Sequence, residues 1–166
     1  MKRYNDTLKK RYRALVYLLG TIILGAGAFT LVPLVVLPFW PSETVFALPF
    51  ILTSIICFFI GGILTLRFRS YYKITLTLEE GGVLVLLSWG SIILLSSAPF
   101  IFAGQLGFIK AIFESTSGWT TTGLSVVDVT TAPRIFLLWR SLMQFAGGAG
   151  VAVIMLSAII GPHGLS

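Results

Sequence analysis

The sequence predicts an all-α membrane protein with four transmembrane helices, one re-entrant pore helix and a filter loop. Of its 166 residues, 56% are hydrophobic and only 11% are charged, whereas about a quarter of a soluble domain is charged. The apolar residues form long uninterrupted stretches, and one segment between the last two stretches is too short to cross a bilayer. The arrangement is one helix–pore–helix unit preceded by an extra pair of helices.

The charges predict the orientation in the membrane. Lys and Arg outnumber Asp and Glu by 12 to 6, and the basic residues cluster in the first thirteen residues and in the segment from Arg67 to Lys73. The positive-inside rule places both clusters on the cytoplasmic side of the inner membrane, with the N-terminus in the cytoplasm. Glu43 lies in a linker without Lys or Arg, so it is expected to face outward together with Asp128. Topology thus accounts for the basic residues, and no nucleic-acid partner is expected.

The first two apolar stretches run from Ala14 to about Trp40 and from Val45 to Leu66. Each exceeds the ~20 residues that a helix needs to cross the hydrocarbon layer. Pro33 and Pro38 are expected to bend or end the first helix. A signal peptide is the alternative for the N-terminus, since residues 26–28 imitate a cleavage site, but the apolar run continues well past them.

The third stretch begins with a capping-box pattern, in which Thr77 and Glu80 satisfy free backbone donors at a helix start. The helix is predicted over Gly81 to Ser97, with its end near Pro99. A fourth long apolar stretch, Ile135 to Ile160, is predicted to be the last transmembrane helix.

The segment between these helices has a different character. Residues Gln105 to Trp119 favour a helix, but it would reach only about 22 Å. The β-branched residues and glycine of Thr120 to Ser125 then disfavour a helix. Irregular backbone at membrane depth must be buried in protein or line a water-filled cavity, which indicates a re-entrant pore loop whose carbonyls coordinate a cation. The alternative is an extracellular loop with a surface helix.

Specific residues in this segment resemble a known family. Residues 113–123, Phe-Glu-Ser-Thr-Ser-Gly-Trp-Thr-Thr-Thr-Gly, closely resemble the first pore-loop signature of the Trk branch of the Trk/Ktr/HKT superfamily of potassium transporters. Residues 80–85, Ser88-Trp89, Ala98-Pro99-Phe100 and residues 138–150 are similar to the helices that flank this loop. The resemblance covers roughly residues 75 to 160, and the first two helices fit the extra N-terminal pair of the Trk branch.

The resemblance implies a membrane subunit with four pseudo-repeated units around one potassium pathway. It also implies a homodimer and a cytoplasmic nucleotide-binding regulatory subunit, with potassium as substrate and no cofactor. This chain contains one unit, at residues 74–166, after an N-terminal helix pair at residues 1–73. Its partners would then include the remaining three units, and the chain is expected to be an N-terminal fragment, a truncated product or one piece of a split transporter.

The filter residues follow from matching the loop to the general potassium-channel pattern of Thr, apolar or Thr, then Gly. The match makes Thr121, Thr122, Gly123 and Leu124 the residues that present main-chain carbonyls, with potassium at the first three. Gly123 matters most because glycine tolerates the backbone angles that such carbonyls require. The alternative is a simple turn glycine after a threonine run.

Three charged residues are candidates for a supporting role. Glu114 and Arg140 lie within otherwise apolar helices and are expected to form an ion pair or hydrogen-bonded brace behind the filter. Alternatively, Arg140 extends to the outer surface and Glu114 meets water. Asp128 either concentrates cations at the mouth or is an ordinary exposed loop carboxylate. The small residues Ala146 to Gly150 are expected to pack closely against the short helix.

Three functional classes remain. Potassium transport leads, and a non-conducting membrane scaffold or assembly subunit is second. A membrane enzyme is third and is not expected, because the chain lacks a nucleophile–base pair. Cys57 has no second cysteine to pair with, and His163 is the single histidine, which excludes a histidine-rich metal site.

Overall fold

The computed structural model describes the backbone of residues 2–160 and the side chains of residues 8–153. The regular structure of the described backbone is entirely helical, without a β-strand. Its α-helices are α1 (Lys2–Thr30), α2 (Ala47–Phe68), α3 (Leu78–Phe102), α4 (Phe108–Trp119) and α5 (Arg134–Ile160), and its 3-10 helices are η1 (Val32–Val36), η2 (Pro41–Phe46) and η3 (Arg69–Tyr71). His163 and the other residues after Ile160 lie outside the described part.

Four helical segments in the described residues are long and apolar enough to cross a membrane. They are Leu8–Val36, Pro41–Tyr71, Leu78–Phe102 and Arg134–Val153. The prediction of an all-α chain with four candidate membrane spans is therefore confirmed. The helix α4 has 12 residues and is too short to be a span by itself.

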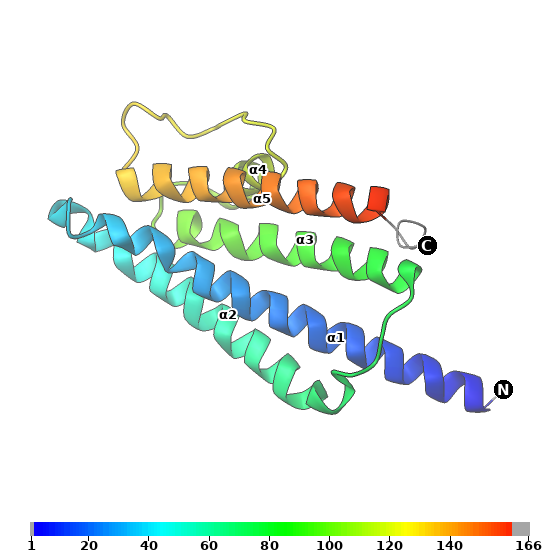
Figure 1. The fold of residues 1–166 in the computed structure, drawn as a ribbon. Coiled ribbons are helices and arrows are strands. Elements are labelled where there is room, and N and C mark those ends of the chain that lie inside the picture. Colours follow the sequence, from blue (N-terminus) through cyan, green and yellow to red (C-terminus); the bar gives the residue numbers. More distant parts are fainter. Residues whose placement is uncertain (1, 161–166) are drawn as a thin grey trace.

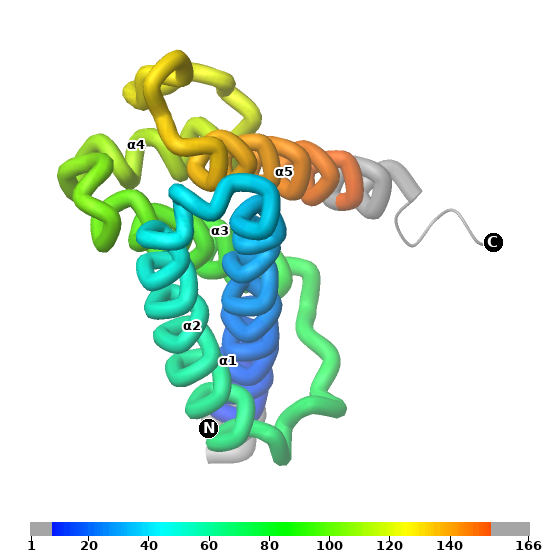
Figure 2. Tube along the Cα trace, turned by 90° about the vertical axis from the view of Figure 1, so that its left-hand side faces the viewer, coloured from blue at the N-terminus to red at the C-terminus, as the bar shows by residue number. Residues whose placement is uncertain are grey.

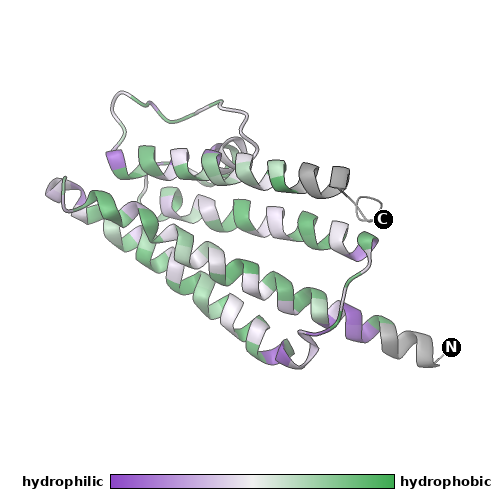
Figure 3. Ribbon diagram, in the orientation of Figure 1, coloured by the Kyte–Doolittle hydropathy of each residue, from purple (hydrophilic) through white to green (hydrophobic). Residues whose placement is uncertain are grey.

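The connections between the long helices gather at two opposite ends of the molecule (Figure 1). One end, here called the loop end, holds η1, η2, residues 103–107 and the connection from α4 to α5. The other, the basic end, holds the first turns of α1, η3 and the start of α3, and Figure 3 shows hydrophilic residues concentrated there on α1 and around η3. Helix α4 is seen nearly end-on in Figure 1 and from the side in Figure 2, so its axis runs across the long helices.

Helices α1 and α2 form a tightly packed hairpin because small residues line their contact. A Cβ atom on Gly27 would lie 2.8 Å from the Cβ of Cys57, and one on Gly61 would lie 2.8 Å from the Gly20 carbonyl oxygen. The Ser54 hydroxyl donates to the Gly27 carbonyl at 2.9 Å. Without side chains at these glycines, the two backbones approach closely enough for such a bond.

Prolines modify the helix ends in two different ways. Helix α1 ends at Thr30, and Pro33 lies in the first turn of the separate helix η1, so the first apolar stretch is not one continuous helix. Helix α3 continues through Pro99 to Phe102, and its predicted end near Pro99 is wrong by one turn. Pro99 lacks an N–H group but its carbonyl accepts from the Ala103 amide at 3.1 Å, so the helix continues.

The predicted capping box at the start of α3 is confirmed. The Thr77 hydroxyl accepts from the Glu80 amide at 3.4 Å, and the Thr77 amide donates to the Glu80 carboxylate at 2.8 Å. Two backbone donors at the helix start are thereby satisfied.

The core lies where the loop ends of the helices meet, and aromatic side chains fill it. Phe50, Phe100, Phe136 and Trp139 are fully or almost fully buried, and Phe136 has ring centroids of Phe50 and Phe100 at 5.4 and 5.2 Å. The Trp139 indole donates to the Ser96 carbonyl at 3.1 Å. These contacts join α2, α3 and α5.

Glu43, for which the sequence predicts only an outward-facing position, forms a buried contact with the start of α5. Its side chain is buried, with 8% exposure, and its two oxygens accept from the amides of Arg134 and Ile135 at 2.9 Å each. The first amides of a helix lack intrahelical partners and carry partial positive charge, so a carboxylate binds there favourably. The linker between α1 and α2 thus caps the start of α5. The Arg134 guanidinium lies over the Trp40 ring, with 4.8 Å to the centroid, and 4.0 Å from a Glu43 carboxylate oxygen.

We expect Glu43→Gln to destabilise the fold by about 1 to 3 kcal/mol, because one buried amide of α5 loses its acceptor. The measurement is thermal unfolding of the detergent-solubilised chain, followed by tryptophan fluorescence. Glu79→Gln is the matched control, since Glu79 is an exposed carboxylate in the first turn of α3. Equal unfolding temperatures for both variants would show that Glu43 contributes no more than a surface charge.

Candidate functional site

The short helix α4 buries a polar face. Glu114, Ser115, Ser117 and Gly118 are buried, although three of them carry polar side chains. Buried polar groups need hydrogen-bond partners, and α4 finds most of them in the loop that follows it, residues 120–133. This pairing of helix and loop constitutes the candidate site.

The end of α4 lies deep along α5. A Cβ atom on Gly147 would overlap the Trp119 carbonyl oxygen and lie 2.7 Å from the Trp119 carbonyl carbon. Gly147 is thirteen residues after Arg134, the first residue of α5, which corresponds to about 20 Å along the helix axis. The loop from Thr120 must therefore return over that depth to reach Arg134 at the loop end, as Figure 1 shows.

The predicted close packing of the small residues of α5 against the short helix is confirmed at Gly147, and Gly148 lies close to the loop that follows. Gly147 meets the backbone at the end of α4, and a Cβ on Gly148 would lie 3.4 Å from the Thr121 methyl group. One turn nearer the start of α5, Met143 contacts Gly118, since a Cβ on Gly118 would lie 3.1 Å from the Met143 Cβ. α5 therefore approaches α4 and the first loop residues without bulky side chains between them.

Glu114 connects α4, the loop and α5. Its carboxylate forms an ion pair with the Arg140 guanidinium and accepts from the Ser125 hydroxyl at 3.1 Å and the Val126 amide at 2.9 Å. The Glu114 side chain is 1% exposed and that of Arg140 is 12% exposed. The structure thus brings these two charges together, and the buried carboxylate on α4 has three donors, two from the loop and one from α5.

The first loop residues turn their amides toward the end of α4. The amides of Thr120, Thr121 and Thr122 donate to the carbonyls of Thr116, Gly118 and Ser117 at 2.9, 3.1 and 3.0 Å. These carbonyls would otherwise lack partners at the helix end. Thr121 and Gly123 have positive φ angles of 56° and 80°, and this change of backbone direction takes the chain out of the helix.

The carbonyls of Thr121, Thr122 and Gly123 accept no hydrogen bond from any residue that the structure describes. All three residues are exposed in this chain. The next carbonyl, that of Leu124, differs because it accepts from the buried Ser117 hydroxyl at 2.5 Å. The Thr121 hydroxyl donates to the Thr120 carbonyl at 2.7 Å. Three consecutive free carbonyls therefore lie between two anchored ones.

Asp128 lies farther along the loop and is used within it. Its carboxylate accepts from the Thr130 hydroxyl and amide at 2.6 and 2.9 Å and from the Thr131 hydroxyl at 3.1 Å. These bonds, led by the Thr130 hydroxyl, hold the pKa of Asp128 below its usual value. The hydrogen bonds of the Asp128 carboxylate thus stay within the turn at residues 128–131 and do not involve Thr121 to Leu124.

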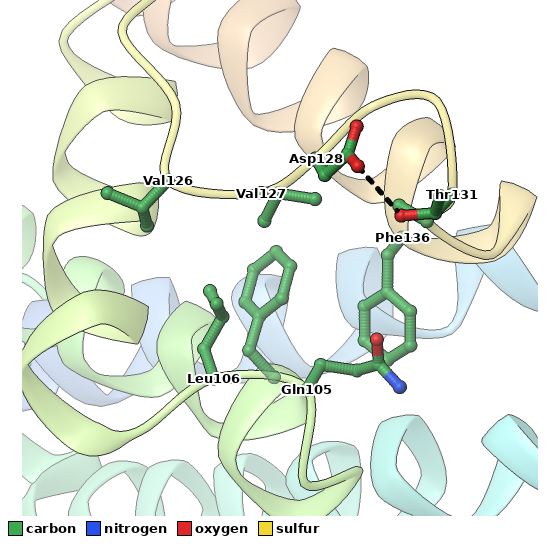
Figure 4. Close-up of a pocket in the computed structure, with 9 residues that line it drawn as sticks. Gln105, Leu106, Val126, Val127, Asp128, Thr131 and Phe136 are labelled. Atoms are coloured by element: carbon green, nitrogen blue, oxygen red, sulfur yellow. Dashed lines mark hydrogen bonds between the residues drawn. The ribbon is translucent and has the colours of Figure 1, made fainter.

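A pocket of about 200 Å³ lies beneath this second half of the loop (Figure 4). Val126, Val127 and Asp128 border it from above, and Leu106 and Phe136 border it from below. Thr121 to Leu124 do not line it. The pocket is thus part of the loop end and separate from the free carbonyls.

Three serines that sequence reasoning did not single out hold the site together. Ser117 binds the Leu124 carbonyl, Ser125 binds Glu114, and the Ser96 hydroxyl accepts from the Trp119 indole at 2.9 Å. Their signal in the sequence is a small hydroxyl residue within an otherwise apolar helix or beside a buried charge. That signal identifies a buried polar residue but does not identify its partner.

The fold and this site define a multi-pass helical membrane protein with a short helix, buried on one face, followed by an irregular loop. The family model described as "TrkH: Cation transport protein" matches residues 48–163. The chain therefore belongs to the TrkH cation transport protein family, as the pore-loop residues indicated.

Curated relatives agree with this assignment. The chain is 31% identical to the Trk system potassium uptake protein TrkG of Escherichia coli over 155 residues, which cover 89% of this chain and 30% of the relative. It is 32% identical to the Trk system potassium uptake protein TrkH of Salmonella typhimurium (89% and 31%) and 31% identical to an uncharacterized cation transporter of Methanocaldococcus jannaschii (92% and 31%). The chain thus spans about 30% of the length of these relatives. Their names describe transporters and not enzymes, in agreement with the prediction.

We expect Gly147→Ala to separate α5 from the end of α4, because the new methyl group meets backbone atoms that cannot rotate away. Overpacking of this kind costs about 1 to 3 kcal/mol. The thermal unfolding temperature of the detergent-solubilised chain should fall accordingly. Gly150→Ala is the control on the same helix, since a Cβ there meets nothing within 4 Å. An unchanged unfolding temperature for Gly147→Ala would contradict the close approach.

Proposed function

We propose that this chain supplies one of the four pore-loop units of a Trk-type potassium uptake protein. In this proposal α4 is the pore helix, and Thr121, Thr122, Gly123 and Leu124 are the filter segment, with potassium bound at the first three. The names of the relatives support potassium as the cargo. Because the chain spans about 30% of those relatives, the remaining units belong to the rest of a longer chain or to a split partner.

The row of free carbonyls carries the proposal. Potassium loses its water shell when it enters a narrow site, and carbonyl oxygens replace that water. The carbonyls of residues 121–123 accept no hydrogen bond from the residues that the structure describes. These residues follow α4 closely, and the C-terminal end of that helix carries partial negative charge. The Leu124 carbonyl has one bond from Ser117, so a second lone pair remains for an ion.

The depth of the loop supports a re-entrant path. Irregular backbone about 20 Å along a transmembrane helix would lack partners in lipid, so it must face protein or water. Glu114 and Arg140 then act behind the filter, as supports that fix the loop through Ser125 and Val126. Asp128 would lie at the outer mouth.

The wider assembly follows from the same proposal. Residues 1–73 form the N-terminal helix pair and residues 74–166 the first pore-loop unit, with the N-terminus and the basic end on the cytoplasmic side of the inner membrane. The complete protein forms a homodimer and binds a cytoplasmic nucleotide-binding regulatory subunit, as the family resemblance implies.

A non-conducting scaffold or assembly subunit is the second candidate. The observation that favours it is the single filter segment in this chain, which supplies only one quarter of a four-unit site. Ion flux through a completed transporter separates the two functions, because the transport proposal predicts that changes at Thr121 to Leu124 alter the flux and the scaffold proposal predicts that they do not.

In the completed transporter we expect Gly123→Ser to reduce the preference for potassium over sodium. Position 123 has a φ of 80°, and a Cβ there strains the backbone by about 1 to 3 kcal/mol although the surrounding space is open. If this strain distorts the bound-ion geometry, the preference changes about five- to hundredfold. The measurement is potassium and sodium uptake by cells that lack other potassium uptake systems, at equal protein abundance.

The matched control is Gly104→Ser. Gly104 also has a positive φ, 67°, with open space around it, but it lies in the turn after α3. The control variant has similar backbone strain and should keep its ion preference. If both variants keep the preference of the unmodified protein, Gly123 is only a turn residue and the filter assignment fails.

We also expect the purified 166-residue chain to conduct no potassium by itself, because most of the coordination shell is missing. The measurement is potassium flux into liposomes that contain only this chain. Robust potassium-selective flux would contradict the single-unit interpretation and would indicate that several copies assemble one pore.

A further inference from the structure

The basic end contains a pocket of about 300 Å³ that the potassium pathway does not use. Tyr17, Arg69 and Tyr72 line it. Tyr17 comes from α1, while Arg69 and Tyr72 come from η3 and the residue after it. The pocket therefore lies between the first transmembrane helix and the turn that follows the second one.

Neighbouring residues hold this turn against α1. The Arg13 guanidinium donates to the Tyr71 hydroxyl at 2.5 Å and lies over the Tyr71 ring, with 5.4 Å to the centroid. Arg13 is one helical turn before Tyr17, so this contact lies next to the pocket. The two sides of the pocket are thereby held together without using Arg69.

The turn that contributes Arg69 and Tyr72 to the pocket is strongly positive. Residues 65–76 contain Arg67, Arg69 and Lys73 and no acidic residue. The Lys73 ammonium lies over the Tyr72 ring at 5.5 Å and the Arg67 guanidinium over the Phe68 ring at 5.8 Å. Among the side chains that the structure describes, no carboxylate forms an ion pair with Arg69. The guanidinium that lines the pocket is thus available for an anion.

We propose that this pocket binds the phosphate of an anionic glycerophospholipid. A guanidinium and tyrosine hydroxyls are suitable donors for phosphate oxygens, and arginine can bind phosphate with two parallel bonds. The pocket lies where the apolar spans give way to basic residues, at the depth that lipid headgroups occupy. Its excess positive charge favours a lipid with net negative charge over a zwitterionic one. The acyl chains would follow the exposed apolar side chains of α2, among them Leu66 and Ile63.

The test measures lipid retention by the purified 166-residue chain with native mass spectrometry. The chain is incubated in detergent with equal amounts of phosphatidylglycerol and phosphatidylcholine. We expect preferential retention of phosphatidylglycerol and a loss of about tenfold or more in Arg69→Ala, since this variant removes a charge-assisted hydrogen bond to the phosphate as well as a nearby charge. Equal retention of both lipids by the unmodified chain would overturn the proposal.

Arg67→Ala is the matched control for diffuse attraction. It removes the same charge two residues away, but Arg67 does not line the pocket. A binding site requires a clearly larger loss in Arg69→Ala, whereas equal losses in both variants would mean that the lipid senses only the general charge. An excess of inorganic phosphate should leave lipid retention unchanged. Displacement of the lipid by phosphate would assign the pocket to free anions and overturn the proposal.

Tyr17→Phe provides a second test that does not depend on the charge. It removes the hydroxyl of a residue that lines the pocket and keeps the ring, so the thermal unfolding temperature without added lipid should stay unchanged. We expect phosphatidylglycerol retention to fall about two- to fivefold with the loss of one hydrogen bond. If Arg69→Ala fails to fold, this variant decides alone, and unchanged retention in Tyr17→Phe overturns the proposal.

Discussion

The carboxylate of Glu114 is the group on which the candidate site depends. A buried charge is costly unless opposite charge and hydrogen bonds surround it, and Glu114 has both, from Arg140, Ser125 and the Val126 amide. These donors come from α5 and from the loop, so satisfying one side chain fixes three segments relative to one another. The free carbonyls of residues 121–123 lie between Glu114 and these partners along the chain, and their position follows from this contact.

A second carboxylate performs a similar task at the loop end. Glu43 caps the first amides of α5 and thereby attaches the α1–α2 hairpin to the helix that carries Arg140. The two contacts lie on one helix, about 9 Å apart along its axis if measured from Arg134 to Arg140. α5 is thus held at its start by the N-terminal helix pair and farther along by α4. The loop between α4 and α5 therefore has two fixed ends.

Long apolar stretches made the four spans predictable from sequence, because length and hydropathy determine a membrane helix more strongly than any single residue. The capping box at Thr77 was equally clear, since it depends on residues three positions apart. The end of α3 was not, because whether a helix ends at a proline depends on how neighbouring segments satisfy the carbonyl that loses its partner. The contact of Glu43 was not predicted for a related reason, since its partner lies 91 residues away in the sequence.

The same contrast separates the two halves of the candidate site. The residue types of the Thr-Thr-Gly run point to carbonyl chemistry by themselves, because glycine permits the positive φ angle that the structure has at position 123. The supporting contacts depend on the fold. The hydrogen bonds from Ser117 to the Leu124 carbonyl and from the Trp119 indole to Ser96 join residues that have no recognisable relation in the sequence. A loop without these supports would be free to turn its carbonyls toward its own amides. Because the amides of residues 120–122 bind carbonyls at the end of α4, they are not available to the carbonyls of residues 121–123, which accept no hydrogen bond from the residues that the structure describes.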